Sequence, residues 1–456
     1  MDVHRALASA ETEVLVLASV INGVGVSSET GSGRNSGFGS DIADPGLAEG
    51  GLARIAWAER AMPVLGLLRE ECASKQPFAG RSIAACLHIT AETAILAGVL
   101  TAGGGRVHLA ASNPLSTQDD IAAALASQPG VFVNAKTGVD RETYYADLHR
   151  ALDGAPDLVV DDGGDLVNTL HADRPELLPA VVGGCESTST GVARLRQMAA
   201  AGTLAFPVVA ADVSVTRRMF DNGYGTSQSV IDGLLRATNI LLAGKTVVVA
   251  GYGSSGSAIA DRAAGFGAQV IVTEIDPVRA LDAIMRGHRV LPMAEAAPVG
   301  DVFITATGSR DVITGEHLAA MRDGAVLANA GHFDVEIDVR ALGDLAVRVN
   351  RGIRPHADEY VLAGGSRLIL LADGRVVNLI AAEGNPAAVM DLSFAAQALA
   401  LMWLISGEAG LPAGLHPMPA AIDTEVARLK LAAHGTRIDE LTAAQREYLA
   451  SWRQGS

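Results

Sequence analysis

Three glycines and one acidic residue in the middle of the chain could bind a dinucleotide. Gly251, Gly253 and Gly256 form a G-x-G-x-x-G pattern after the apolar run of residues 246–250, and Glu274 follows 23 positions after the first glycine. The first glycine of such a motif allows a tight turn, the second lets the backbone approach a pyrophosphate, and the third lets the helix pack on the sheet. The helix N-terminus attracts the phosphate charge. A carboxylate at Glu274 would bind a ribose diol and repel a 2′-phosphate, so the pattern predicts NAD rather than NADP; a glycine turn in another kind of α/β protein is the alternative.

The elements that must position these residues alternate between strand-like and helix-like stretches. From Ser82 onward the runs SIAACLHIT, RVHLAASN, VFVNA and PDLVVDD are strand-like, and ETAILAGVLTAGG and DDIAAALASQ lie between them. A second series starts after Gly244 with KTVVVA and continues through VIVTEID, VFITATG and AVLANAG to about residue 350. Strands that alternate with helices predict mostly parallel sheets covered by helices. The sequence therefore predicts two α/β units and a helical piece at residues 417–456.

Length and composition restrict the class of partner. The 456 residues are too many for one compact core, and 49% hydrophobic with 19% charged residues is typical of a folded α/β enzyme. The formal net charge of -16 argues against a surface for nucleic acid or an anionic membrane, because phosphate binding needs clustered Lys and Arg. We therefore expect a small-molecule partner, with neither nucleic acid nor a membrane.

Cysteine use and apolar runs indicate the compartment. The three cysteines include no C-x-x-C pair, so they predict neither a disulfide framework nor a zinc site, and we expect no metal. The apolar stretch at residues 14–21 is short, and we expect no run of membrane-spanning length. These features predict a cytoplasmic protein. The Gly/Ser-rich residues 27–41 are predicted to form a flexible loop that serves as a lid or an assembly contact.

Many ordered segments resemble the S-adenosylhomocysteine hydrolase family, from about residue 82 to the C-terminus. They are LHITAETAIL, SNPLSTQDD, DDGGDLVNTLH, ESTSTGVARL, SVTRRMFDNGYGTSQSVIDG, RATNILLAGK, GYGSSG, VTEIDP, NAGHFDVEIDV and VNLIAAEGNPAAVMDLSFAAQ. The SNPLSTQDD segment and the ending LASWRQGS, without a Lys-Tyr tail, resemble the shorter archaeal and bacterial type.

The resemblance implies a domain organisation. A Rossmann-type NAD-binding domain is inserted into a second α/β domain that binds substrate, a small helical C-terminal extension follows, and the protein forms a homotetramer. We place the substrate-binding domain at residues 1–212 and 385–416. The NAD-binding domain, with a hinge at each end, is placed at residues 213–384, and the oligomerisation segment at residues 417–456.

The resemblance also implies a redox cycle on the ribose of an adenine nucleoside. The 3′-hydroxyl is oxidised with the help of tightly held NAD, and the new ketone acidifies the C4′ proton by providing an adjacent electron sink. A base then removes that proton, the 5′ substituent leaves, water adds, and the ketone is reduced again.

Individual site residues follow from the same resemblance. His88 and Asp162 match an acid/base pair near C4′ and C5′, and a histidine with a carboxylate suits proton transfer near neutral pH. Arg217 and Asp221 match positions beside the 3′-hydroxyl, and His332 matches a histidine at the hinge and the substrate mouth. The implied substrate contacts are Thr90, Glu92, Thr93, Ser187, Glu383, Asn385, Met390 and Phe394. The implied NAD contacts, beside the glycines and Glu274, are Thr188, Ser189, Thr190, Asn222, Ser254, Ser255, Thr305, Thr307 and Asn378.

Four residues depart from the family pattern where it carries chemistry. Ser187 stands in place of a glutamate that holds the ribose hydroxyls, and Arg217 in place of a lysine that relays the 3′-hydroxyl proton. Asn385 replaces a histidine that contacts the purine, and Glu383 replaces a smaller or apolar residue. A guanidinium stays protonated and cannot act as a general base, so Asp221 is a candidate proton acceptor. The smaller side chain at position 187 would leave space for a bulkier pentose.

These departures lead to three functional hypotheses. The preferred one is an elimination that expels water or another 5′-type group from a modified adenine nucleoside and gives an exocyclic 4′,5′-alkene, by analogy with conversion of psicofuranine (angustmycin C) to decoyinine (angustmycin A). The second is ordinary hydrolysis of S-adenosylhomocysteine to adenosine and homocysteine. The third is an NAD-bound regulatory pseudoenzyme.

Overall fold

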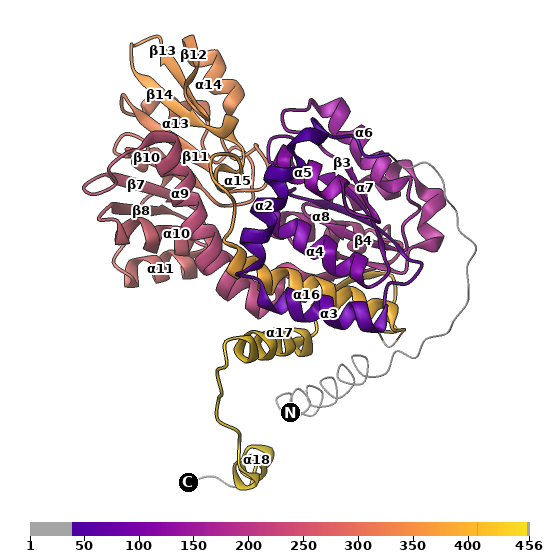
Figure 1. The fold of residues 1–456 in the computed structure, drawn as a ribbon. Helices are drawn as coiled ribbons and strands as arrows, with labels where there is room; N and C mark the ends of the chain where they lie inside the picture. Colours follow the sequence, from indigo (N-terminus) through magenta and orange to yellow (C-terminus); the bar gives the residue numbers. More distant parts are fainter. Residues whose placement is uncertain (1–38, 408, 454–456) are drawn as a thin grey trace.

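The computed structural model describes residues 39–407 and 409–453 and contains two α/β lobes side by side (Figure 1). The first lobe is built on a seven-stranded sheet with the order β15-β6-β5-β4-β1-β2-β3, and every neighbouring pair in it is parallel. Its strands are β1 (Ser82–Leu87), β2 (Arg106–Ala111), β3 (Val131–Asn134), β4 (Leu158–Asp161), β5 (Gly183–Glu186), β6 (Pro207–Ala210) and β15 (Gly414–Pro417).

Helices cover both faces of this first sheet, so its central strands are buried along most of their length rather than alternating between buried and exposed residues. On one face lie α2 (Ala48–Glu59), α3 (Pro63–Lys75), α4 (Ala91–Ala102), α5 (Asp119–Ala126) and α16 (Ala387–Ile405). On the other face lie α6 (Arg141–Leu152), α7 (Asp165–Asp173) and α8 (Ser189–Ala200). Short 3₁₀ turns are η1 (Pro45–Leu47), η2 (Pro175–Ala180) and η3 (Ala211–Val213).

The second lobe holds an eight-stranded sheet with the order β12-β13-β14-β11-β10-β7-β8-β9. Its strands are β7 (Thr246–Ala250), β8 (Gln269–Thr273), β9 (Arg289–Val290), β10 (Val302–Thr305), β11 (Ala325–Asn329), β12 (Ala346–Arg354), β13 (Ala357–Leu362) and β14 (Arg367–Leu371). Its helical elements are the π-helix η4 (Arg217–Thr226), α9 (Ser227–Thr238), α10 (Ser254–Gly265), α11 (Pro277–Met285), α12 (Met293–Ala296), α13 (Gly315–Ala320), α14 (Val339–Leu345), α15 (Val377–Ile380) and the 3₁₀ turn η5 (Ala372–Gly374).

The fold confirms the predicted α/β class but extends the second unit. The predicted strand-helix rhythm stops near residue 350, whereas the sheet continues through the antiparallel strands β12 and β13 to β14. Half-exposed edge strands carry polar residues that interrupt an apolar run, and β12 includes three arginines and an asparagine among its nine residues, with Arg351–Arg354 exposed. A pattern search for apolar runs therefore passes over this edge.

Helix α16 corrects the expectation that no run reaches membrane-spanning length. Its 19 residues are long and apolar enough to cross a membrane by length and composition, yet 72% of that window is buried inside the protein. A helix that is hydrophobic on all sides is expected when neighbours surround it, and α16 packs against α3, α4, α17 and β5. It is therefore a core helix of the first lobe.

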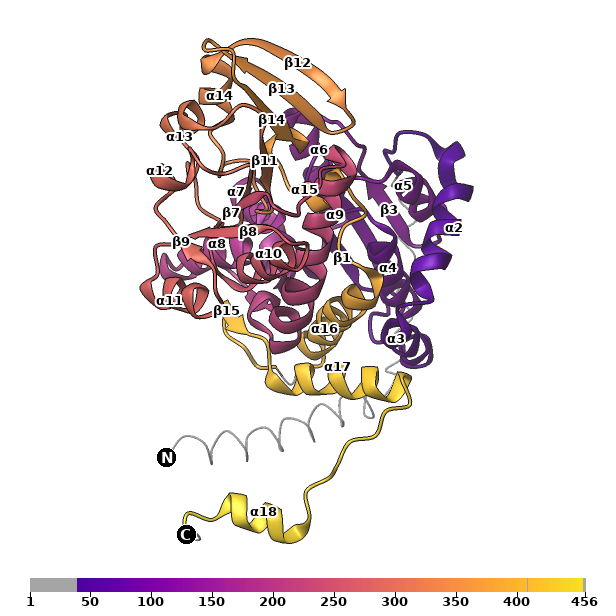
Figure 2. The same ribbon diagram turned by 90° about the vertical axis from the view of Figure 1, so that its left-hand side faces the viewer.

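The two ends of the described chain differ in their packing. Residues 27–38 of the predicted loop lie outside the described residues, but at Asp41 the chain is fixed, because its backbone N–H donates to Val133 (2.8 Å) and its carboxylate pairs with Lys136 and Arg150. At the other end, α17 (Ala420–Ala433) packs on α16, whereas α18 (Ala443–Ala450) lies apart from both lobes in two views (Figures 1 and 2).

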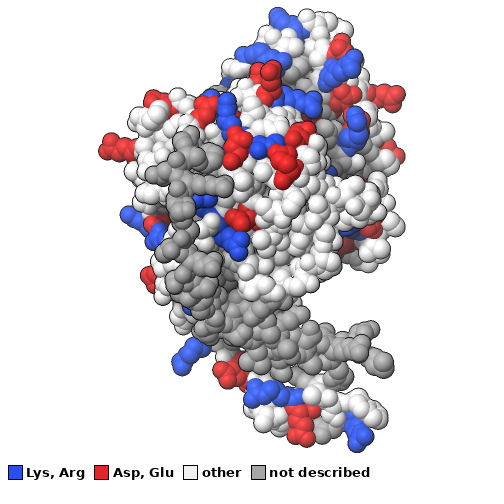
Figure 3. Space-filling view, turned by 90° about the vertical axis from the view of Figure 1, so that its right-hand side faces the viewer, with Lys and Arg blue, Asp and Glu red and all other residues white. Residues whose placement is uncertain are grey.

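The surface charge follows the composition. On the face shown in Figure 3, the Lys and Arg side chains of the described residues lie among Asp and Glu side chains rather than forming one basic patch.

Candidate active site

A cavity of about 1310 Å³ lies where the carboxyl ends of the two sheets meet. Its lining includes residues directly after β1, β4 and β5 of the first lobe and after β7, β8 and β10 of the second. Ligands of parallel α/β sheets bind at the carboxyl ends of the strands, where loops and helix N-termini converge. The volume exceeds that of an ordinary small-molecule pocket, which is consistent with a dinucleotide and a second ligand together.

The glycine turn between β7 and α10 fits a dinucleotide. Gly251 has a φ of +92°, and a Cβ there would lie 2.8 Å from the carbonyl oxygen of Ala306. At Gly256 a Cβ would lie 2.0 Å from the carbonyl oxygen of Gly251, so α10 packs directly on the turn. Gly253 faces open space, with only Arg279 nearby at 3.6 Å. The backbone can therefore approach a pyrophosphate here, as predicted.

Glu274 stands at the end of β8 with its carboxylate fixed by backbone donors. It accepts hydrogen bonds from the N–H groups of Tyr252 (2.7 Å), Ile275 (2.7 Å) and Asp276 (3.0 Å). Burial by itself raises the pKa of Glu274. The three backbone donors together lower it by more than burial raises it, so the net shift of the pKa is downward. A carboxylate with a lowered pKa is charged at neutral pH and can accept hydrogen bonds from a ribose diol.

Replacing Glu274 with serine is expected to weaken NAD binding by about tenfold or more and to reduce the preference for NAD over NADP. Hydrogen bonds to a charged group contribute about 1.5–3 kcal/mol, and the repulsion of a 2′-phosphate disappears with the carboxylate. Equilibrium titration of both cofactors measures this change. Glu316→Ser, at an exposed carboxylate of the same lobe, should leave both affinities unchanged. Unaltered discrimination in Glu274→Ser would contradict the assignment.

His88 follows β1 and is held as a neutral base. Its Nδ1 lies 2.7 Å from the Ser116 hydroxyl, and that hydroxyl donates to the carbonyl oxygen of Asn113 at 3.2 Å. Since the Ser116 proton is directed to Asn113, its oxygen accepts from Nδ1–H, which leaves Nε2 with a free lone pair. Burial, with the charges of His332 and Arg217, lowers the pKa of His88 to about 3. His88 is thus a neutral imidazole at neutral pH, with its proton on Nδ1 and none on Nε2.

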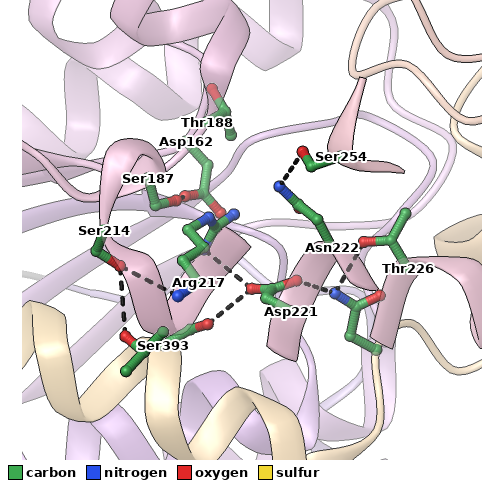
Figure 4. Close-up of polar contacts among 12 residues, drawn as sticks. Asp162, Ser187, Thr188, Ser214, Arg217, Asp221, Asn222, Thr226, Ser254 and Ser393 are labelled. Carbon is green, nitrogen blue, oxygen red and sulfur yellow. Dashed lines mark hydrogen bonds and ion pairs between the residues drawn. The ribbon is translucent and has the colours of Figure 1, made fainter. Parts of the chain in front are cut away.

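Asp162 follows β4 and is suited to hold a proton near neutral pH. Burial raises its pKa to about 7, although the Arg217 guanidinium opposes this rise and Asp221 adds to it. The Ser187 hydroxyl, which follows β5, donates to the Asp162 carboxylate (Figure 4). An acid with this pKa can donate at pH 7 and accept again after a bond has broken.

Arg217 and Asp221 form an ion pair of 3.1 Å along one side of the π-helix η4 (Figure 4). Burial tends to lower the pKa of Arg217, but the carboxylates of Asp221 and Asp162 raise it, so the guanidinium stays charged. The Asp221 carboxylate also accepts from Ser393 (2.7 Å) and from the amide of Asn385. These four groups therefore form one cluster around the buried carboxylate of Asp221, which accepts from the other three.

The remaining substrate positions surround this cluster. Thr90, Glu92 and Thr93 begin α4, where Thr93 donates to the backbone carbonyl of His88 at 2.6 Å. His332 lies with its ring centroid 5.7 Å from that of His88. Burial, partly opposed by Asp165, lowers the pKa of His332 to about 4.

Glu383 differs from the other predicted substrate residues, because its carboxylate is partly exposed and makes ion pairs. It lies 2.6 Å from Arg54 of α2 and 3.3 Å from Arg236 of α9. It thus connects the two lobes at one margin of the cavity.

The cavity brings together almost all residues predicted from the sequence. Its lining includes the five predicted catalytic residues, the eight predicted substrate residues and the predicted NAD residues, apart from two. Gly256 packs behind the turn, and Thr305 is a correction: it is fully buried at the end of β10 and donates to Asn329 at 2.9 Å. The residue after next, Thr307, does line the cavity.

Two supporting residues were missed by the sequence reasoning. Ser116 orients His88, and Ser393 donates to Asp221. Both occur within segments used for the family resemblance, SNPLSTQDD and DLSFAAQ, but a serine in a loop or a helix does not by itself indicate which side chain it will meet.

Comparison with known proteins identifies the class and then the family. A profile described as S-adenosyl-L-homocysteine hydrolase matches residues 40–177, and one described as S-adenosyl-L-homocysteine hydrolase, NAD binding domain, matches residues 222–384. With the glycine turn, these matches define an NAD-dependent enzyme with a Rossmann-type domain. The chain belongs to the S-adenosyl-L-homocysteine hydrolase family, which confirms the predicted resemblance and cofactor.

Relatives match nearly the whole chain. Adenosylhomocysteinase of Aquifex aeolicus is 54% identical over 416 residues, which are 91% of this chain and 99% of that protein. Adenosylhomocysteinase of Saccharolobus solfataricus is 51% identical over 416 residues, with the same shares covered. S-inosyl-L-homocysteine hydrolase of Methanosarcina mazei is 48% identical over 410 residues, covering 90% of this chain and 99% of that protein. The exact domain boundaries stay a prediction.

Proposed function

We propose that this enzyme cleaves S-adenosylhomocysteine to adenosine and homocysteine through transient oxidation of the ribose 3′-hydroxyl. The observation that carries the proposal is the convergence of a neutral histidine base, His88, and a near-neutral acid, Asp162, in the cavity that also contains the glycine turn. The names of the relatives support this reaction more strongly than the dehydration that the sequence analysis preferred.

The roles follow from the protonation states. The glycine turn at Gly251 and Gly253, with Glu274, would hold NAD, which would supply the oxidant for the 3′-hydroxyl and, in its reduced form, the reductant for the ketone. His88 Nε2 takes the C4′ proton, and Asp162 gives its proton to the departing sulfur, so that a 4′,5′-alkene forms. Water then adds at C5′ while the Asp162 carboxylate takes its proton, and His88 returns a proton to C4′.

The proton of the 3′-hydroxyl needs a separate acceptor. Arg217 remains charged and cannot take it. We assign this proton to Asp221, the carboxylate paired with Arg217, and we assign to Arg217 the stabilisation of the oxygen from which the proton leaves.

A second candidate, dehydration of a nucleoside with a modified sugar, is favoured by one observation at Ser187. Its hydroxyl is bound to Asp162, so the group that would hold a ribose diol in the family is replaced by a smaller one that faces the acid. The smaller side chain would leave space at this position for the extra hydroxymethyl group of a psicofuranose. Because water is a poorer leaving group than a thiolate, protonation by Asp162 would be essential.

One incubation series separates these functions. The protein is mixed with S-adenosylhomocysteine, adenosine or psicofuranine, while the absorbance of enzyme-bound NADH and the product masses are measured. Homocysteine release supports the proposed hydrolysis. Loss of one water from psicofuranine alone supports dehydration and overturns hydrolysis. No NADH with any nucleoside, in protein that holds NAD, indicates the regulatory alternative.

We further propose that the enzyme works in the cytoplasm as a homotetramer. The support for the assembly is the separate helix α18 and the residues directly after it, where the side chains of Tyr448, Leu449 and Trp452 are exposed in the single chain. Light scattering on the purified protein would measure the assembly.

A further inference from the structure

Two buried carboxyl groups, Asp161 and Glu186, lie directly behind the proposed site. They are the last residues of β4 and β5, and each precedes a residue that faces the cavity, Asp162 or Ser187. The two are paired in the parallel register of these strands, so their side chains leave the sheet on the same face about 5 Å apart at the backbone. Their side chains are 1% and 0% exposed, and the mechanism above does not use them.

Each carboxyl group has one oxygen with donors and one without. One oxygen of Asp161 accepts from the N–H of Val167 at 2.8 Å. One oxygen of Glu186 accepts from the N–H groups of Gly163 (3.0 Å) and Thr188 (2.8 Å), and from the Thr188 hydroxyl. The other oxygens, Asp161 Oδ1 and Glu186 Oε2, have no hydrogen-bond donor among the described residues.

Two ionised carboxylates in this arrangement would be unfavourable. A buried charge without a partner is unfavourable, and two like charges on neighbouring strands repel each other in a medium of low dielectric constant. The Glu186 carboxyl is packed closely on the backbone of Gly191, where a Cβ would lie 2.2 Å from its carboxyl carbon. A single proton held by the pair leaves one negative charge instead of two and so removes the repulsion, and it gives a donor to oxygens that otherwise have none.

We propose that Asp161 and Glu186 share one proton and act as positioning residues, holding the turns that present Asp162 and Ser187 and keeping one negative charge behind Asp162. The effect on Asp162 rests on the proposed function, whereas the shared proton does not. Neither residue touches the cavity, so both act through their neighbours.

The electrostatic surroundings agree with a retained proton. Burial raises the pKa values of both Asp161 and Glu186; Asp161 and Asp162 raise that of Glu186 further, and Asp165 and Asp162 raise that of Asp161. The titratable and charged groups facing the pair are Asp162 after β4, Asp165 on α7, Arg194 on α8, Arg217 on η4, Cys86 on β1 and Tyr144 on α6. The two arginines pair with other carboxylates, Asp165 and Asp221, and neither bonds to the proposed pair.

The first test observes the proton directly. Infrared spectra of the holoenzyme at pH 7 should show the carbonyl stretch of a buried protonated carboxylic acid, and this band should weaken in Glu186→Gln and in Asp161→Asn. Asp391→Asn is the matched control, because Asp391 is also fully buried but all its contacts are donors: the N–H groups of Val64 and Leu65 and the Lys430 ammonium. An unchanged band in both pair variants overturns the proposal, even if S-adenosylhomocysteine is turned over.

The second test uses thermal unfolding against pH. Since the folded pair holds a proton that the unfolded chain releases above about pH 4–5, its contribution to stability falls as pH rises toward the raised folded pKa. Glu186→Gln replaces that proton by an amide N–H, so its melting temperature should depend less on pH across this range than that of the wild type. Asp391→Asn should lower the melting temperature without flattening the pH dependence. A Glu186→Gln profile parallel to the wild type contradicts the shared proton.

The third test reads the effect on Asp162 through the pH profile of turnover. The double variant Asp161→Asn/Glu186→Gln removes the negative charge behind Asp162, so the decline of activity at high pH should begin at lower pH. Glu186→Gln alone keeps one charge and should retain the wild-type midpoint. If the infrared band behaves as expected but no nucleoside reacts, the proposed function is wrong and the shared proton stands. Equal midpoints in all three proteins would show that the pair does not act on Asp162.

Discussion

Replacing Asp162 with asparagine is expected to lower turnover by about 10²–10⁴-fold, because a positioned general acid contributes that much to catalysis. Asparagine keeps the shape of the side chain and can still accept from Ser187, but it has no proton to give to the leaving group. Steady-state rates of product formation measure the loss. The NAD dissociation constant should not change, because Asp162 lies on the first lobe, whereas the glycine turn lies on the second.

The pH profile gives this prediction a direction. Asp162 with a pKa of about 7 is protonated at lower pH, and His88 with a pKa of about 3 is neutral throughout that range. The elimination rate should therefore be high below about pH 7 and fall as pH rises above it. In Asp162→Asn the residual rate should lack this decline. Asp173→Asn, at an exposed carboxylate on α7, should keep both the rate and the profile. A rate within a few-fold of the wild type in Asp162→Asn would exclude Asp162 as the acid.

The sequence contained enough local information to predict the cofactor site. The turn requires glycine at Gly251, where φ is positive, and at Gly256, where any side chain would meet the backbone. Such constraints act within a few residues of each other, so they are visible as a motif. Glu274 could be added because it follows the next apolar strand.

The contacts inside the cluster could not be predicted in the same way. Ser187 meets Asp162 only because β4 and β5 are neighbours in the sheet, and Asn385 meets Asp221 across 164 positions of sequence. Strand order and helix packing decide such meetings, and neither is encoded in the spacing of a motif. The error at Thr305 has the same origin. Thr305 is the last residue of β10 and is buried in the core, whereas the residues directly after it line the cavity.

The largest gain of activity is expected from restoring the family pattern at three positions. The variant Ser187→Glu/Arg217→Lys/Asn385→His should release homocysteine from S-adenosylhomocysteine at least about tenfold faster than the wild type. A desolvated lysine can lose its proton and relay that of the 3′-hydroxyl, which the permanently charged Arg217 cannot. A general base in this step contributes about 10²–10⁴-fold.

The three changes are expected to be non-additive, because the residues share partners. Arg217 and Asn385 both bond to Asp221, and Ser187 bonds to the Asp162 carboxylate that Arg217 also affects. Glutamate at position 187 alone would place a second carboxylate beside Asp162 and should lower the rate of homocysteine release. Adding lysine at position 217 and histidine at position 385 should restore that rate and raise it above the wild-type value. Single, double and triple variants measured under the same conditions give the coupling energies.

A control substitution tests whether an arginine-to-lysine exchange elsewhere in the protein changes the rate in the same way as the exchange at position 217. Arg322→Lys, at a half-exposed arginine of the second lobe, should not change the rate. Bound NAD and the melting temperature confirm that each variant is folded. If the folded triple variant holds NAD and releases homocysteine no faster than the wild type, positions 187, 217 and 385 do not determine the reaction. If it gains hydrolysis while losing the dehydration of psicofuranine, the same three positions set which leaving group this cavity accepts.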